Sequence, residues 1–104
     1  MKTDRELLEL AAKASGELTA SWYGNDAYFD GVLSRWNPLT DDGDALRLAV
    51  KLKLQIRPND YDVMVVAQLP AHITVVEVCD YKDPYAATRR AIVRAAAEIG
   101  RGMK

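Results

Sequence analysis

The chain has 104 residues, which is enough for one compact domain (residues 1–104) and too few for two. Hydrophobic residues make up 49% and charged residues 28%, which is the composition of a globular chain rather than a disordered one. The net charge of −1, from 14 basic and 15 acidic groups, argues against a nucleic-acid coat protein or a polybasic membrane binder, because both depend on excess positive charge.

Cysteine content and hydropathy indicate the cellular compartment. Cys79 is the single cysteine, so no disulfide can form within the chain. No apolar stretch approaches the roughly 18 residues that span a bilayer. The N-terminal MKTDRELLEL is acidic and lacks the continuous apolar run of a secretory signal. We therefore expect a cytoplasmic protein in a reducing environment.

The first element is predicted to be a helix over residues 4–15. Thr3 and Glu6 match a capping box, in which each side chain accepts a hydrogen bond from the backbone N–H of the other residue. Leucines and alanines then recur at helical spacing on one face. Gly16 is expected to end the helix, because glycine takes the left-handed conformation easily.

An aromatic β-hairpin is predicted next, with strands over about 18–23 and 27–34. The sequence Gly24-Asn25-Asp26 is a turn signal between these strands. The neighbouring aromatic residues Tyr28 and Phe29 are typical of a strand. The hairpin is expected at an edge of the sheet, because its two faces are mixed in polarity.

The second helix is predicted over about 41–52. Pro38 cannot lie inside a helix, so the preceding strand must end before it. Apolar residues then recur at helical spacing through this segment. After the helix, Leu54 and Ile56 alternate with polar residues, which predicts a short strand at an edge of the sheet.

Two strongly β-prone runs follow, over residues 61–69 and 73–79. In both runs the apolar side chains alternate onto both faces, which is typical of strands in the middle of a sheet. An Asp-Pro pair then opens the last helix, predicted over residues 84–99. Gly100 is expected to end that helix.

These elements define the fold class. Their order is α-β-β-α-β-β-β-α, which predicts an α+β domain with a mostly antiparallel sheet and helices packed on it. Because the central strands are apolar on both faces, we expect helices on both faces of the sheet, in an α/β/α sandwich.

Three carboxylates, those of Asp41, Asp42 and Asp44, form the most conspicuous motif, and it has two interpretations. The carboxylates could bind a metal ion or do acid–base chemistry, but an EF-hand loop counted from Asp41 would require Glu where Leu52 stands. Alternatively they form the acidic first turn of a helix capped by Thr40 or Asp41. We favour the helix start, and expect no metal site, no cofactor and no catalytic residue.

Other catalytic signals are weak. His72 falls in a predicted turn with no partner placed beside it, and Cys79 ends an apolar β-run. The sequence has no zinc spacing, no P-loop, no GxGxxG and no GxSxG. The neighbouring carboxylates Asp60 and Asp62 remain as an alternative. We expect that the protein is not an enzyme.

The last helix carries three arginines, namely Arg89, Arg90 and Arg94. Guanidinium groups on a shared helix face could bind phosphates or an acidic partner, which makes these residues candidate anion ligands. The alternative is an ordinary solvated face, stabilised by cations near the helix C-terminus.

Aromatic residues gather in the predicted hairpin and the loop after it, namely Trp22, Tyr23, Tyr28, Phe29 and Trp36. Exposed aromatic side chains often serve as anchors in protein interfaces, so these residues are candidates for partner binding. They could equally form cross-strand pairs or part of the core.

Three stretches of the sequence carry a resemblance to known proteins: TDRELLELAAKA, WNPLTDDGDALRLAVKL and DPYAATRRAIVRAAAEIG. They resemble small bacteriophage and prophage proteins of the phage α/β/α (ABA) sandwich domain family. The resemblance covers most of the chain and rests on its three helices. It implies an α/β/α sandwich and a phage origin, and it supplies no catalytic residue.

Small size, missing catalytic motifs and this resemblance together favour a non-enzymatic phage accessory protein. We expect it to bind a host protein in the bacterial cytosol, for example a defence or regulatory factor, through the aromatic hairpin. The alternative is a small-ligand or nucleotide-binding protein that uses the arginines of the last helix. Membrane and nucleic-acid partners are not expected, and a homodimer is left open.

Overall fold

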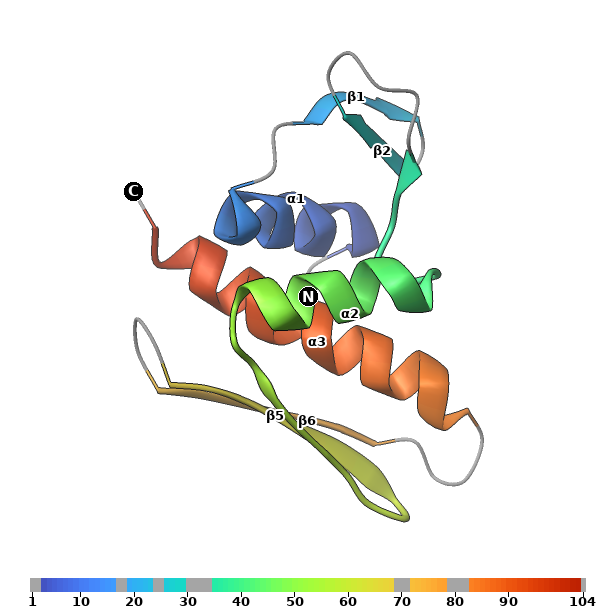
Figure 1. Ribbon diagram of the computed structural model, residues 1–104, viewed down its shortest axis with the longest axis vertical. Coiled ribbons are helices and arrows are strands. Elements are labelled where there is room, and N and C mark those ends of the chain that lie inside the picture. Colours follow the sequence, from blue (N-terminus) through green and yellow to red (C-terminus); the bar gives the residue numbers. More distant parts are fainter. Residues whose placement is uncertain are drawn as a thin grey trace.

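The computed structural model describes residues 3–16, 19–23, 26–29, 35–68, 72–78 and 83–103, and for 19–23, 26–29 and 35 it describes the backbone alone. The described residues form three helices and two three-stranded antiparallel sheets (Figure 1). This confirms the expected α+β class and the antiparallel pairing.

Helix α1 runs from Asp4 to Ser15 and begins as the sequence predicts. The Thr3 side chain accepts a hydrogen bond from the Glu6 backbone N–H, and the Glu6 carboxylate accepts one from the Thr3 N–H. Gly16 ends the helix in the left-handed conformation, with a φ of 75°. The buried face of the helix consists of Leu7, Leu8, Ala11, Ala12 and Ser15.

Helix α2 runs from Asp42 to Lys51 and ends in a Schellman motif. The Lys53 N–H donates to the Val50 carbonyl at 3.2 Å, and the Leu54 N–H donates to the Ala49 carbonyl at 2.9 Å. Lys53 takes the left-handed conformation that this motif requires, with a φ of 56°. Glycine usually occupies this position, because a Cβ atom strains it.

Helix α3 runs from Pro84 to Arg101, so the prediction that Gly100 ends it is wrong. Gly100 lies against the backbone of α1, and a Cβ atom there would overlap the Leu10 carbonyl group. Glycine at this position therefore allows the two helices to approach closely. Helix α3 ends at Gly102.

The first sheet pairs β1 (Thr19–Tyr23), β2 (Asp26–Phe29) and β3 (Arg35–Trp36) in that order. The hairpin of β1 and β2 is the one that the sequence predicts, and β3 is a short strand that it does not predict. The second predicted strand extends to residue 34, and its part after residue 29 lies outside the described residues.

The second sheet pairs β4 (Gln55–Pro58), β5 (Asp62–Ala67) and β6 (Ile73–Val78). The strand order is β4-β5-β6, so β5 is central, as predicted. The prediction that β6 also lies inside the sheet is wrong, because within the described residues β6 is an edge strand.

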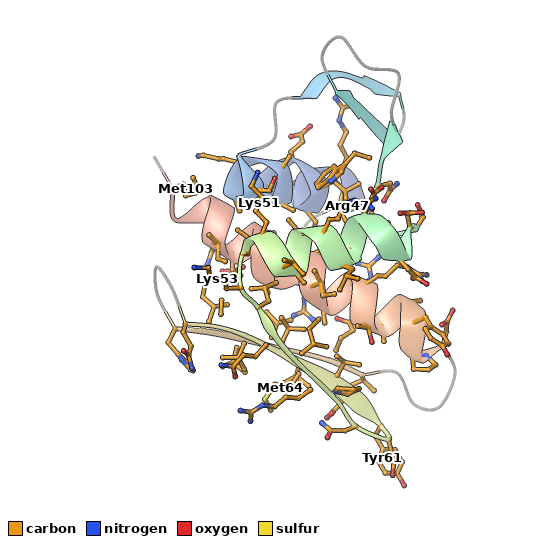
Figure 2. The ribbon with its side chains drawn as sticks, viewed as in Figure 1. Arg47, Lys51, Lys53, Tyr61, Met64 and Met103 are labelled. Atoms are coloured by element: carbon orange, nitrogen blue, oxygen red, sulfur yellow. The ribbon has the colours of Figure 1, made fainter. Side chains whose placement is uncertain are left out.

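The three helices lie on one side of this second sheet, with α3 next to it and α1 and α2 beyond (Figure 1). Helices on both faces were expected, yet in the described part of the chain no helix lies on the other face. Met64 lies on that face, away from the helices (Figure 2). The side facing the helices contributes Val63, Val65 and Val75 to the core.

Helices α1 and α3 pack closely through small side chains. Ala11 on α1 and both Ala95 and Ala96 on α3 are fully buried. Arg90 on α3 forms an ion pair with Asp4 at the start of α1. No helix in the described part of the chain is long and apolar enough to cross a membrane.

Candidate functional site

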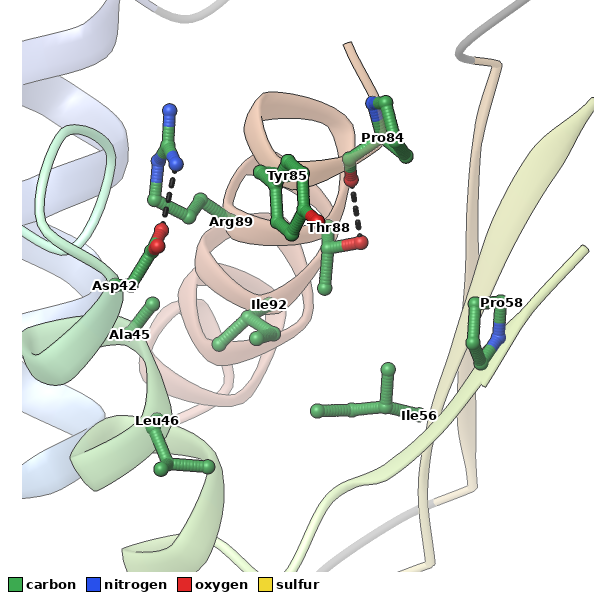
Figure 3. Close-up of a pocket in the computed structure, with 10 residues that line it drawn as sticks. All are labelled: Asp42, Ala45, Leu46, Ile56, Pro58, Pro84, Tyr85, Thr88, Arg89 and Ile92. Atoms are coloured by element: carbon green, nitrogen blue, oxygen red, sulfur yellow. Dashed lines mark hydrogen bonds and ion pairs between the residues drawn. The ribbon is translucent and has the colours of Figure 1, made fainter. Parts of the chain in front are cut away.

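A groove of about 520 Å³ opens between α2, the first turns of α3 and the edge strand β4 (Figure 3). Its wall is formed by residues of all three elements, namely Asp42, Ala45, Leu46, Ile56, Pro58, Pro84, Tyr85, Thr88, Arg89 and Ile92. Its volume lies in the range of about 300–1,000 Å³ that is typical of small-molecule sites.

The groove owes its shape to large side chains where three elements converge. Ile92 of α3 and Ile56 of β4 point into the space between them, and Pro58 stands beside Ile56 (Figure 3). Leu46 and Tyr85 stand on the rim with 60% and 71% of their surface exposed. Exposed apolar residues around a concave apolar wall are typical of a binding surface.

The polar end of the groove is an ion pair between two helices. Arg89 on α3 donates to the Asp42 carboxylate at 2.6 Å and to the Leu39 carbonyl at 2.8 Å. Only 18% of the Arg89 side chain is exposed. The pair therefore fixes the start of α2 against α3 and places one positive and one negative group at the end of an apolar wall.

Three polar side chains of the groove, Asp42, Thr88 and Arg89, are bound to one another or to the backbone. The Thr88 hydroxyl donates to the Pro84 carbonyl at 2.6 Å, and Arg89 and Asp42 pair with each other. No described wall residue is a histidine or cysteine, and no nucleophile there lies beside a general base. The arrangement suits the binding of apolar groups rather than covalent or acid–base chemistry.

The acidic motif is used to build the start of α2. Asp41 is the N-cap, and its carboxylate accepts the Asp44 N–H at 2.8 Å. Asp44 is buried and accepts the Asn37 N–H at 3.0 Å and the Arg47 guanidinium at 2.7 Å. The interpretation as an acidic helix start is confirmed, with Asp41 rather than Thr40 as the cap.

These carboxylates have different partners. Asp42 accepts a hydrogen bond from Arg89, while Asp44 accepts hydrogen bonds from the Asn37 N–H and from Arg47. Among the described residues, no group of three or more acidic, histidine or cysteine side chains is placed to hold a metal ion. The hydrogen bond that Arg47 donates to the Asp44 carboxylate raises the pKa of Arg47 above its ordinary value, against a smaller opposing effect of desolvation.

The three candidate arginines of α3 are not brought together into one anion site. Arg89 pairs with Asp42, Arg90 pairs with Asp4 at 2.9 Å, and Arg94 pairs with Glu77 of β6. An incoming phosphate would have to displace a carboxylate at each position. Of the three, Arg89 alone lies in the wall of the groove.

The aromatic residues predicted to bind a partner are only partly placed by the structure. Trp36 lies in the core with 5% of its surface exposed, so the prediction that it is a surface anchor is wrong. The side chains of Trp22, Tyr23, Tyr28 and Phe29 lie outside the described residues. Trp36 is buried because β3 leads directly into the buried turn before α2.

Sequence reasoning missed the groove, although one signal was present. Leu46 lies on α2 outside the buried stripe that contains Ala45 and Leu48, and 60% of its surface is exposed. Apolar residues off the buried stripe indicate a second apolar face on a helix. The contributions of β4 and α3 depend on tertiary packing and carry no local signal.

His72 makes only a local contact in the described structure, with its Nε2 atom 3.3 Å from the Thr74 hydroxyl. Cys79 lies outside the described residues.

Comparisons with protein families, with curated proteins and with solved structures found no match to the chain.

Proposed function

We propose that the protein is a non-enzymatic binding protein, and that the groove between α2, α3 and β4 receives an apolar segment of a protein partner. The observation that carries this proposal is the apolar wall of about 520 Å³ with exposed Leu46 and Tyr85 on its rim. In a typical interface, a few buried aromatic and aliphatic anchors supply most of the binding free energy.

The chemistry of the groove defines the partner segment. Ile56 and Ile92 offer contacts only to apolar side chains, while the Asp42–Arg89 pair offers one acceptor and one donor at one end. A segment with apolar anchors followed by one polar or charged residue fits this distribution. Following the resemblance to small phage proteins, the proposed partner is a host protein in the bacterial cytosol, for example a defence or regulatory factor.

A quantitative pull-down from bacterial lysate tests the position of the binding surface. The groove variant is Leu46→Asp with Tyr85→Ala, and the matched control is Val50→Asp with Tyr61→Ala, because these two residues are similarly exposed but lie outside the groove. A partner captured by wild type and by the control should be lost from the groove variant. Equal recovery with all three proteins would reject the groove as the binding surface.

The partner identified in this way permits a measurement of affinity. Replacement of the two rim residues Leu46 and Tyr85 should weaken binding at least about tenfold, since truncation of an important interface residue costs more than 1 kcal/mol. Isothermal titration calorimetry with the purified partner would show this difference, and the control variant should bind like wild type. Circular dichroism would verify that both variants are folded.

The alternative function, small-ligand or nucleotide binding, is favoured by one observation. Arg89 lies in the wall of a groove of small-molecule size and is the candidate phosphate ligand there. A ligand selective for the folded state raises the melting temperature, so a thermal-shift screen with nucleotides at millimolar concentration tests it. A shift that Arg89→Gln abolishes would support this alternative, and unchanged melting with every nucleotide would reject it.

A further inference from the structure

The two edges of the second sheet differ in their protection against pairing with another strand. Strand β4 has four residues and carries Arg57 and Pro58, and a charged residue and a proline both discourage strand addition. Strand β6 has six residues, ITVVEV, with no proline, lysine or arginine. Natural proteins usually protect an edge of this length, so the contrast between the two edges requires an explanation.

Strand β6 has the composition of an interior strand although it lies at an edge. Its residues alternate between a side facing the helices, with Ile73 and Val75, and the open face, with Val76 and Val78. Val76 is 42% exposed and Val78 is 71% exposed. A strand that is apolar on both faces is typical of a position between two other strands.

We propose that β6 pairs with β6 of a second copy of this chain, antiparallel across a two-fold axis, to form a continuous six-stranded sheet. An axis through Val76 places Val76 against the partner's Val76 and Thr74 against the partner's Val78. These are pairs of β-branched residues, which stabilise antiparallel strands. The same axis joins the open faces of both sheets, so Met64 and Val76 of each copy form one apolar row.

The charges at this edge are compatible with pairing to an identical strand. Glu77 is the only charged residue of β6, and Arg94 of α3 neutralises it and also donates to the Val76 carbonyl at 3.1 Å. With the axis at Val76, Glu77 lies opposite the partner's Val75, so like charges do not face each other. The carbonyl oxygen of Val76 can accept a second hydrogen bond from the partner strand.

The expected dimer is weak and independent of the proposed groove. The groove includes the opposite edge strand, β4, so both copies of it stay accessible in the dimer. Two paired six-residue strands with their side chains bury less than the ~1,200 Å² at the lower limit of standard interfaces. We therefore expect a dissociation constant in the micromolar range.

Sedimentation velocity of the intact protein, from low micromolar to millimolar concentration, tests the proposal. Wild type should change from monomer to dimer over this range, whereas Val76→Lys should stay monomeric because it places two lysines face to face. Val50→Lys introduces the same change on an exposed part of α2 and should dimerise like wild type. Monomeric wild type at every concentration, or a dimer that persists in Val76→Lys, would overturn the proposal.

Disulfide cross-linking tests the pairing of β6 between two copies even if Val76→Lys fails to fold. In a Cys79→Ser background, Val76→Cys should give a covalent dimer under mild oxidation, and Val50→Cys should give none at the same concentration. Equal cross-linking of the two variants would reject pairing at β6. A synthetic peptide of residues 73–78 that bound the chain while wild type stayed monomeric would also reject the second copy as the occupant.

Discussion

On one side of α3 the helix α1 packs backbone against backbone, whereas on the other side α2 and β4 leave a groove of about 520 Å³. The closed side is made of Gly100 and alanines, and the open side has Ile92 and Tyr85 of the same helix. Side-chain size along α3 therefore decides where the helices pack closely and where a groove remains. Substitutions on the closed side should affect stability, and those on the open side should affect binding.

The largest effect should come from Gly100→Ala, which breaks the closed side. The new methyl group would overlap the Leu10 carbonyl, so the two helices must separate, and the free energy of unfolding should fall by about 3 kcal/mol. At an unobstructed helix position the same change would stabilise by about 1 kcal/mol. Urea denaturation followed by circular dichroism measures the difference.

The matched control for this substitution is Gly102→Ala in the same helix terminus. A Cβ atom at Gly102 would lie no closer than 3.6 Å to the Ile99 carbonyl oxygen, which is an ordinary contact. The free energy of unfolding of the Gly102→Ala variant should stay within about 0.5 kcal/mol of the wild-type value. Stability unchanged by Gly100→Ala would contradict the close approach of α1 and α3.

An intermediate effect is expected for Asp44→Ala, a buried position at the start of α2 outside the groove wall. This change leaves the buried Asn37 N–H without its acceptor and removes the nearer of the two carboxylates that pair with Arg47, so stability should fall by about 2 kcal/mol. Asp44→Asn keeps an acceptor for the Asn37 N–H and should lose less. If both variants lost the same amount in urea denaturation, the hydrogen bond would not be the cause.

The smallest effect should be a gain. Lys53→Gly relieves the left-handed conformation at the end of α2 and should stabilise the protein by about 0.5–1 kcal/mol. Lys51 is the last residue of α2, and Lys51→Gly should destabilise the protein by about 0.5–1 kcal/mol, so substitutions of the two lysines should have opposite signs. A thermal melt of each variant measures these stability changes. Stability changes of the same sign in both variants would contradict the Schellman motif at Lys53.

Local signals in the sequence predicted the helices and strands well. Thr3 with Glu6, the Asp41 cap and the Asp-Pro start of α3 all satisfy backbone N–H groups within a few residues, so they are visible without knowledge of the fold. The end of α3 was not predictable in this way. Glycine is required at position 100 by the contact with Leu10, which is distant in sequence.

The candidate site was less predictable than the fold. The three carboxylates of the acidic motif lie close together in sequence, yet Asp41 and Asp44 stabilise the start of α2 and Asp42 pairs with Arg89 of α3. The groove joins Leu46, Ile56 and Tyr85 from three separate elements, and only tertiary packing brings them together. Trp36 is buried for the same reason, since its burial depends on where β3 meets the helices.

The pairing of α1 with α3 also sets an order of events during synthesis. Arg90 and Asp4 are separated by 86 positions, and α1 packs chiefly against α3. At about 5–20 residues per second, the ribosome needs roughly 4–17 s to extend the chain from one of these residues to the other. Helix α1 is without its main packing partner throughout this interval, so the nascent chain exposes its first helix until almost all the described chain has been made.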